Sequence, residues 1–355
     1  MDGNYNVVII TNIPNYYKIN LFNEISKRRK IFVVFLASSS SERNPDFYSV
    51  TNCHFDFILL SKSTIESRNI IKGVFKLFKL LTSFSFKFLI ISEWYGLEYW
   101  AALLLGKFKA KTLFTLESNR LKSTHLSFLT LIKRIFLLGI DEALVSGPSH
   151  AKILERLGFR SKIWVTNGVG LSNDFVYHRP EKLNFDSFRV LFVGRLIEDK
   201  NINLILKAFK EACIYRNLEL TIVGDGPLKS FLLANLNDKI RYIEKVANTH
   251  MRSIYENNDI LILPSSNEPW GLVVEEALST QMPVIISSVV GCLDSIVFDE
   301  FNGLVIDAND SDSLVNGLLK MTERDNYLIY QRNASLFDRS IKDKSQVNVY
   351  LQATL

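Results

Sequence analysis

Cysteine is scarce in this chain of 355 residues. Its three cysteines, Cys53, Cys213 and Cys292, are far apart, and none belongs to a CxxC pair. An odd number of dispersed cysteines argues against a disulfide framework and against a structural zinc site. A reducing cytoplasm is therefore the simplest location to expect.

Long uncharged apolar runs are missing too. A helix that spans a membrane needs about 20 nearly uncharged residues, and the nearest candidates, residues 74–91 and 126–138, are interrupted by lysine and arginine. The apolar run near the N-terminus, residues 7–10, is far shorter than the core of a signal peptide. We therefore expect neither a membrane span nor a secretory signal.

Acidic residues are sparse in the first half of the chain. Residues 1–170 contain 23 Lys/Arg and 12 Asp/Glu, a net charge of +11, whereas residues 171–355 contain 19 and 25, a net charge of −6. This asymmetry indicates either a basic domain that meets membrane lipid, a lipid-linked phosphate or nucleic acid, or an ordinary lysine-rich surface. Nucleic acid is disfavoured because the basic residues form no motif interleaved with aromatics.

One segment of the basic half combines charge with helical periodicity. Residues 70–81 place apolar side chains at helical spacing beside Lys72, Lys76 and Lys79. This pattern predicts a helix that lies either on anionic lipid or against a sheet with its lysines in solvent. The charge of the first half favours peripheral contact with an anionic membrane.

What the chain does contain is a regular alternation of short apolar runs and longer amphipathic runs, which predicts parallel α/β sheets. Residues 173–188 lack a clean period and predict a linker between two doubly wound domains. In such folds ligands lie at the carboxyl ends of the strands. The expected strands are residues 7–11, 31–36, 57–60, 88–92, 112–115, 143–146 and 163–166, then 189–193, 219–223, 240–243, 260–263, 284–287 and 304–306.

The most informative segment follows the expected strand 260–263. A polar loop contains Glu268, and Gly271 then opens a helix that carries Glu276. The N-terminus of a helix offers free backbone N–H groups to a phosphate, and two carboxylates could accept hydrogen bonds from the hydroxyls of a sugar and a ribose. The alternative is that Glu275 and Glu276 are solvated helix residues and Glu268 an ordinary loop residue.

Two further strand-to-helix loops bear on this site. Gly194 ends a strand and is followed by Arg195 and Lys200, where cations would meet a diphosphate. The turn after residue 223 begins like a GxGxxG fingerprint, but Lys229 stands where the third glycine belongs. A nicotinamide dehydrogenase is therefore disfavoured, and Asp225 is best interpreted as part of a structural turn.

These blocks, together with Asn302-Gly303 further on, stand in an order and spacing that resemble a retaining glycosyltransferase of family 4 with the GT-B fold. The resemblance is close over about residues 165–310. Residues 13–22 resemble, more loosely, the opening of bacterial O-antigen and capsule transferases. The resemblance to family 4 implies an acceptor-binding domain at 1–170, a donor-binding domain at 171–339, and a C-terminal helix at about 340–355 that packs back on the first domain.

The resemblance also assigns roles to residues. It implies that Arg195 and Lys200 bind the donor diphosphate beside Gly194, that Glu268 holds the hydroxyls of the donor sugar, and that Glu276 holds the ribose. The backbone of Gly271, Leu272 and Val273 would contact phosphate. Family members need no metal or other cofactor, and this chain has no DxD motif. The anomeric configuration would be retained by front-face attack, with the leaving phosphate helping to deprotonate the acceptor. The two glutamates should therefore not be interpreted as the acid/base pair of a glycosidase.

The acceptor side departs from the family pattern. Many relatives carry a histidine after a strand in the middle of the first domain, where this chain has Glu117. In the expected GT-B fold the two domains face each other across a cleft. Either Glu117 stands in for that histidine, or His125 reaches this cleft; His125 is otherwise an ordinary residue at a helix start. Tyr16 and Tyr17, in the opening segment, are further candidates on the acceptor side.

The function implied is a metal-independent, hexosyltransferase-type enzyme that transfers a sugar from a nucleotide-diphosphate sugar. Its acceptor would be a lipid-linked glycan of lipopolysaccharide, O-antigen or capsule synthesis, and the enzyme would be cytoplasmic and peripheral on the inner face of the cell membrane. Two alternatives remain open. One is a nucleotide-sugar epimerase with the GT-B fold, and the other is a sugar-nucleotide-binding protein that has lost catalysis.

Overall fold

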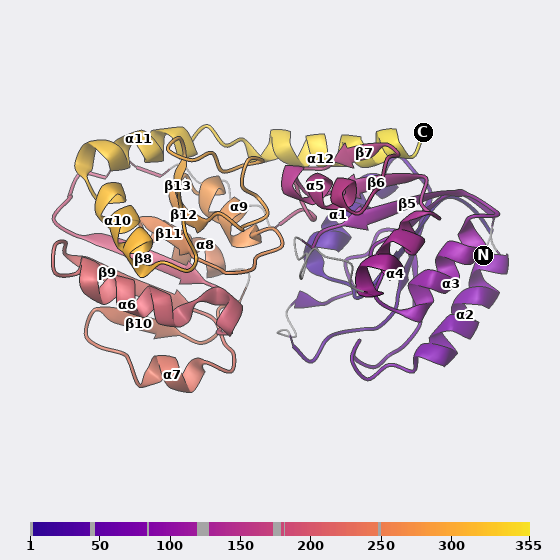
Figure 1. Cartoon of the computed structure of the whole chain (residues 1–355), viewed down its shortest axis with the longest axis horizontal. Coiled ribbons are helices and arrows are strands. Elements are labelled where there is room, and N and C mark those ends of the chain that lie inside the picture. The colour runs from indigo at the N-terminus through magenta and orange to yellow at the C-terminus, as the bar shows by residue number, and fades with distance from the viewer. Residues whose placement is uncertain are drawn as a thin grey trace. The chain divides into compact units, whose positions relative to one another are not determined.

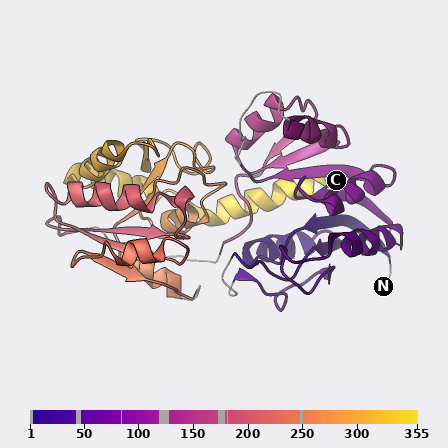
Figure 2. The ribbon, with the colours of Figure 1, turned by 60° about the horizontal axis from the view of Figure 1, so that its bottom comes forward.

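The computed structural model describes residues 3–42, 47–83, 85–118, 128–172, 179–180, 182–247 and 250–355. The chain divides into two compact units (Figures 1 and 2). The first comprises Met1–Ser172 with Lys342–Leu355, and the second comprises Asn173–Ile341. The predicted boundaries at 170 and 339 lie two residues before these divisions. Of the predicted linker, residues 173–178 and 181 lie outside the described part, and Phe188 belongs to a strand.

The first unit has, among its described residues, one parallel sheet of seven strands in the order β3-β2-β1-β4-β5-β6-β7. Register follows the apolar runs, with Val7 opposite Ile31 on one side and Phe88 on the other. The strands are β1 (Asn4–Thr11), β2 (Ile31–Phe35), β3 (Asp56–Leu59), β4 (Ser85–Ile91), β5 (Lys111–Leu116), β6 (Glu142–Val145) and β7 (Ile163–Val165).

Helices cover both faces of this sheet. One core lies under α2 (Ile70–Ser83), α3 (Leu97–Gly106), α4 (Phe128–Leu137) and α5 (Pro148–Arg156). The other lies under α1 (Tyr16–Ser26) and the end of the C-terminal helix α12 (Arg339–Ala353), whose Tyr350 and Leu351 are buried against β1 and β2. Because α12 packs on the first sheet, the chain ends in the unit where it began, as the yellow helix in Figure 1 shows.

The second unit has, within the residues described, a six-stranded parallel sheet in the order β10-β9-β8-β11-β12-β13. Its strands are β8 (Phe188–Val193), β9 (Leu218–Val223), β10 (Ile240–Ile243), β11 (Ile260–Leu263), β12 (Val284–Ser287) and β13 (Gly303–Ile306). Its helices are the 3₁₀ turn η2 (Glu198–Lys200) and α6 (Ile202–Ala212), α7 (Lys229–Leu233), α8 (Met251–Glu256), α9 (Leu272–Ser279), α10 (Ser311–Met321) and α11 (Arg324–Ala334).

The predicted α/β class with two doubly wound sheets is confirmed. Every predicted strand is present, and its ends differ from the prediction by at most three residues. Helix α11 was not predicted. In the part of the chain that the structure describes, no helix is long and apolar enough to cross a membrane.

Candidate functional site

The second sheet changes direction between β8 and β11. From β8 the order runs to β9 and β10 on one side and to β11, β12 and β13 on the other. In an open parallel sheet the loops that leave such a switch point diverge and leave a crevice at the carboxyl edge, where ligands bind. The loops that follow β8 and β11 are therefore the place to look for a site.

The loop after β8 is held against the loop after β9. The backbone N–H of Gly194 donates to the carbonyl of Val223 at 3.0 Å, and that of Leu196 donates to Asp225 at 2.9 Å. Gly224 has a φ of +145°, and a Cβ there would lie 1.8 Å from the carbonyl oxygen of Gly194. Only glycine allows this close approach. The turn is thus structural, as predicted for Asp225.

The two predicted cations, Arg195 and Lys200, both lie in the loop that follows β8. Arg195 is exposed, and Lys200 ends the short helix η2. Lys200 forms an ion pair with Glu268, the carboxylate in the loop after β11. The two side chains are 13% and 14% exposed, so the pair is largely withdrawn from solvent. The structure therefore brings together two residues predicted to bind different parts of one ligand.

Hydrogen bonds to Asp199 fix the distance between these loops. Ser266 N–H donates to the Asp199 carbonyl at 2.9 Å, and Asn267 Nδ2 donates to its carboxylate at 3.0 Å. Asn201 adds a second connection because its Nδ2 donates to the carbonyl oxygens of Pro264 at 2.7 Å and Ala308 at 2.8 Å. One asparagine thus joins the loops that follow β8, β11 and β13.

Helix α9 begins beside Glu268. Gly271 precedes it in the left-handed conformation, with φ +98°. Leu272 and Val273, in its first turn, are partly exposed. The first N–H groups of a helix have no partner within the helix, so this end of α9 can donate to an anion.

The acidic residues of α9 are buried. Glu275 is 0% exposed and accepts a hydrogen bond from Trp270 Nε1 at 2.8 Å; Glu276 is 7% exposed and accepts one from the Tyr255 hydroxyl at 2.6 Å. The alternative that they are solvated helix residues is therefore wrong. Glu275 anchors the buried Trp270, whereas Glu276 is held by α8. The sequence contains no local signal for either pairing.

The first sheet has its switch point between β1 and β4. Lys18, in the first turn of α1, is buried and forms an ion pair with Glu117, which directly follows β5. Glu93 follows β4, and its carboxylate accepts the backbone N–H of Trp94. Sequence reasoning singled out Glu117 but missed Lys18 and Glu93, because a charge cluster made by the start of one helix and two separate loops has no local pattern.

Burial shifts the pKa values of this cluster toward each other. Desolvation lowers the pKa of Lys18 to about 7 although the charge of Glu93 opposes the shift. Desolvation raises the pKa of Glu93 to about 7, against the effects of Lys18, the Trp94 N–H and Lys133. Lys133 also lies over the Trp94 ring, 4.9 Å from its centroid. Such perturbed groups at a sheet edge are typical of functional sites.

The other acceptor-side candidates are placed unevenly. Tyr17 is buried and accepts a hydrogen bond from Asn15 Nδ2 at 3.1 Å, and Tyr16 is partly exposed and packs edge-on against it at 5.6 Å. His125 lies outside the described residues. His150, which was not predicted, is buried with Nε2 3.2 Å from the carbonyl oxygen of Glu117. Within the described ranges no group of three His, Cys, Asp or Glu could hold a metal ion.

Similarity to known proteins agrees with this geometry. Residues 175–335, which lie in the second unit, match the protein family described as "Glycosyl transferases group 1". The sucrose-phosphate synthase of Thermosynechococcus elongatus has the same fold with a TM-score of 0.74, at 17% identity and with 98% of both chains covered. The two Rossmann-like units are those of the GT-B fold.

Two curated relatives are similar over shorter stretches. The Escherichia coli UDP-Gal:alpha-D-GlcNAc-diphosphoundecaprenol alpha-1,3-galactosyltransferase is 34% identical over 148 residues, which cover 40% of this chain and 38% of that protein. The capsular polysaccharide biosynthesis glycosyltransferase CapM of Staphylococcus aureus is 26% identical over 202 residues, which cover 52% of this chain and 51% of CapM. The matched stretches thus span about half the length of these relatives, or less.

Proposed function

We propose that this chain is a retaining, hexosyltransferase-type glycosyltransferase that moves a sugar from a nucleoside-diphosphate sugar to a lipid-linked glycan acceptor. The observation that carries the donor half of this proposal is the meeting of Lys200 and Glu268 at the switch point of the second sheet, beside the N-terminus of α9. A cation, a hydroxyl acceptor and a set of backbone N–H groups there match the parts of a nucleotide sugar.

The roles follow from the chemistry of each group. Arg195 and Lys200 bind the diphosphate, and the N–H groups of Gly271 to Val273 add hydrogen bonds to a phosphate. Glu268 accepts hydrogen bonds from the hydroxyls of the donor sugar. Glu276 accepts hydrogen bonds from the hydroxyls of the ribose, while the Tyr255 hydroxyl donates to one oxygen of the Glu276 carboxylate. Fixed cations also stabilise the charge that develops on the leaving diphosphate, and we propose that transfer needs no metal.

In the transfer step, the bond between the anomeric carbon and the diphosphate oxygen breaks, and the diphosphate keeps the electron pair. The acceptor oxygen forms the new glycosidic bond on the same face of the sugar. Its proton passes to the leaving phosphate oxygen. No carboxylate of this chain acts as the nucleophile in this scheme. Glu268 therefore orients the sugar and does not form a covalent intermediate.

The acceptor is proposed from two observations. The Escherichia coli relative is named for a diphosphoundecaprenol acceptor, and CapM is named for capsular polysaccharide biosynthesis. The first unit, for its part, carries an excess of cations that suits a lipid diphosphate. We therefore place the reaction in surface polysaccharide synthesis, on the cytoplasmic face of the membrane.

The test is nucleotide release from a panel of UDP-, GDP- and dTDP-sugars, with and without undecaprenyl-diphosphate glycans, in the presence of EDTA. We expect release with one donor class, stimulated by an acceptor, and a product whose anomeric configuration by NMR equals that of the donor. Lys200→Ala and Glu268→Gln should each lower the rate about 100-fold or more, because Lys200 stabilises the charge on the leaving diphosphate and Glu268 orients the donor sugar.

Lys229→Ala is the matched control. Lys229 is a partly exposed lysine of the same unit that forms an ion pair with Glu244; it lies in α7 after β9 and not in the loops that follow β8 and β11. It should retain the wild-type rate. Full activity of Lys200→Ala or Glu268→Gln would refute the site. Binding of a nucleotide sugar without release under any condition would favour the binding protein, and conversion of the donor sugar without an acceptor would favour the epimerase.

A further inference from the structure

Three neighbouring helices of the first unit present apolar side chains to solvent. Helices α2, α3 and α4 lie on one face of the first sheet (Figure 1), where α2 contacts α3 and Trp100 of α3 packs edge-on against Phe136 of α4 at 5.1 Å. Their inner faces bury Leu77, Leu103 and Phe136 in the core. These buried side chains already pack the three helices against the sheet. The outward side chains are therefore not needed to hold the helices in place.

On α2 the outward apolar side chains are Ile71, Phe75 and Phe78, spaced four and three residues apart. They form one stripe on the side of the helix away from the buried Leu77 and Leu81. All three are more than half exposed. A helix that served only to cover the sheet would carry polar residues there.

The stripe is repeated on the next helix of the layer. On α3 and the turn after it, Leu97, Leu104 and Phe108 are 63%, 64% and 89% exposed. Their spacing of seven and four residues again places them on one side of a helix.

Helix α4 presents a third stripe. Leu131, Ile135 and Leu138, at and just beyond its end, are 54%, 48% and 78% exposed. Large apolar residues exposed singly need no explanation, but three aligned stripes on adjoining helices form one patch of the kind that marks an interaction surface.

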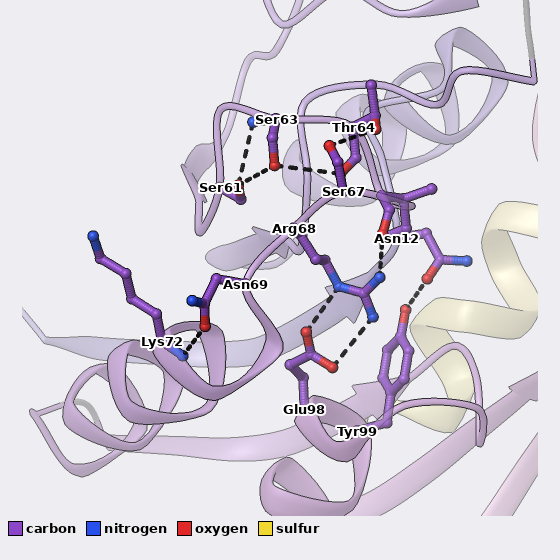
Figure 3. Close-up of polar contacts among 11 residues, drawn as sticks. Asn12, Ser61, Ser63, Thr64, Ser67, Arg68, Asn69, Lys72, Glu98 and Tyr99 are labelled. Carbon is purple, nitrogen blue, oxygen red and sulfur yellow. Dashed lines mark hydrogen bonds and ion pairs between the residues drawn. The ribbon is translucent and has the colours of Figure 1, made fainter.

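The segment that carries these stripes has an excess of cations. Residues 70–140 contain 11 Lys/Arg and 3 Glu. None of the three glutamates, Glu93, Glu98 and Glu117, is exposed. Glu98 binds Arg68 through two hydrogen bonds, of 2.8 and 3.3 Å, between the start of α2 and the start of α3. Figure 3 shows this pair turned inward, while the side chain of Lys72 extends away from it.

We propose that the outward faces of α2, α3 and α4 are a docking surface for a bilayer of anionic phospholipid. The apolar stripes would enter the boundary between headgroups and acyl chains, and Lys72, Lys79 and Arg134 would contact the lipid phosphates. A second copy of the chain is a poorer occupant, because it would bring two cationic rims together and none of the glutamates within residues 70–140 is exposed to pair with them. This proposal rests on the proposed function in one respect only, which is that the acceptor lies at a membrane.

The test is flotation of the full chain with vesicles of phosphatidylcholine, with and without phosphatidylglycerol. Wild type should float with the anionic vesicles at low salt. Phe75→Asp/Leu131→Asp should bind them at least about tenfold more weakly, because each change removes an inserted apolar side chain. Lys72→Glu/Lys79→Glu should lower the affinity for anionic vesicles about fivefold per lysine and should abolish the preference for anionic lipid.

The matched control is Ile214→Asp/Ile329→Asp, at side chains of the second unit that are 75% and 54% exposed, against 70% and 54% for Phe75 and Leu131. It should float like wild type, and circular dichroism should show all variants folded. Failure of wild type to float, equal loss in the control pair, or a dimer that Phe75→Asp dissociates would overturn the proposal. Nucleotide release from a soluble donor reports on the transferase separately and should be unchanged in Phe75→Asp/Leu131→Asp.

Discussion

Asn201 is the residue whose removal gives the sharpest test of how the donor-side loops are held. It has φ +54° and ψ +42°, the left-handed conformation that asparagine tolerates better than most residues. Its side-chain amide donates to the carbonyl oxygens of Pro264 at 2.7 Å and Ala308 at 2.8 Å, and both of these residues are buried. A change to alanine removes both donors and keeps the strained backbone.

The expected loss can be added up from these contacts. Two hydrogen bonds contribute about 1 kcal/mol each, and alanine costs about 1 kcal/mol in the left-handed region. Asn201→Ala should therefore lower the free energy of unfolding by about 3 kcal/mol, measured as a shift of the urea midpoint. It should also weaken binding of the nucleotide, because the loop that holds Lys200 then loses its connections through Asn201 to the loops after β11 and β13.

Asn257→Ala is the matched control for this change. The amide of Asn257 also donates to a carbonyl, that of Ser253 at 2.7 Å, but this bond is exposed and local to α8. Its loss should cost about 0.5 kcal/mol or less. If Asn201→Ala were no more destabilising than Asn257→Ala, the three loops would not depend on this asparagine and the reasoning would be refuted.

Two further predictions concern backbone fit and pH. Gly224→Ala should destabilise the chain by more than about 3 kcal/mol, because its Cβ would lie 1.8 Å from the Gly194 carbonyl oxygen. The control Gly158→Ala, at φ +92° with open space around it, should cost about 1 kcal/mol. Equal melting temperatures of the two variants would contradict this prediction. Since burial raises the pKa of Glu93 from 4.5 to about 7, its contribution to stability is fully present below pH 4.5 and is lost as the pH rises through 7. Glu93→Gln should therefore gain stability relative to wild type across that range, and a difference independent of pH in urea titrations would count against a buried Glu93.

The fold could be predicted because buried parallel strands are continuous apolar runs, and this chain separates them with amphipathic helices. β11 and β12 are buried at every position, so the pattern left no competing interpretation. α11 was missed because its sequence is polar on most sides; it is held by Tyr327 and Tyr330, which are buried against the sheet and its neighbours. Two tyrosines among charged residues do not make an apolar stripe.

The candidate site divides in the same way. Arg195, Lys200 and Glu268 could be predicted to lie together because each follows a strand of one sheet, and parallel strands end at the same edge. The partners of Glu117 and Glu276 could not be predicted. Lys18 and Glu117 are 99 residues apart, and Tyr255 and Glu276 are 21 apart on different helices. Such pairs depend on side-chain direction within a packed core, which no spacing in the sequence encodes.

The pairing of Lys200 with Glu268 has a consequence for how a donor could be selected. Both groups are largely buried, and the attraction within a buried ion pair is mostly offset by the desolvation of its charges, so exchanging its partners costs little. A lone nucleoside diphosphate would draw Lys200 away from Glu268 and supply nothing to that carboxylate, and a buried charge that loses the opposite charge of its ion pair is destabilised. An intact nucleotide sugar supplies phosphate to Lys200 and hydroxyls to Glu268 at once. Under the proposed function, the pair therefore discriminates in favour of the donor and against the product nucleotide, while the exposed Arg195 can contact the diphosphate of either.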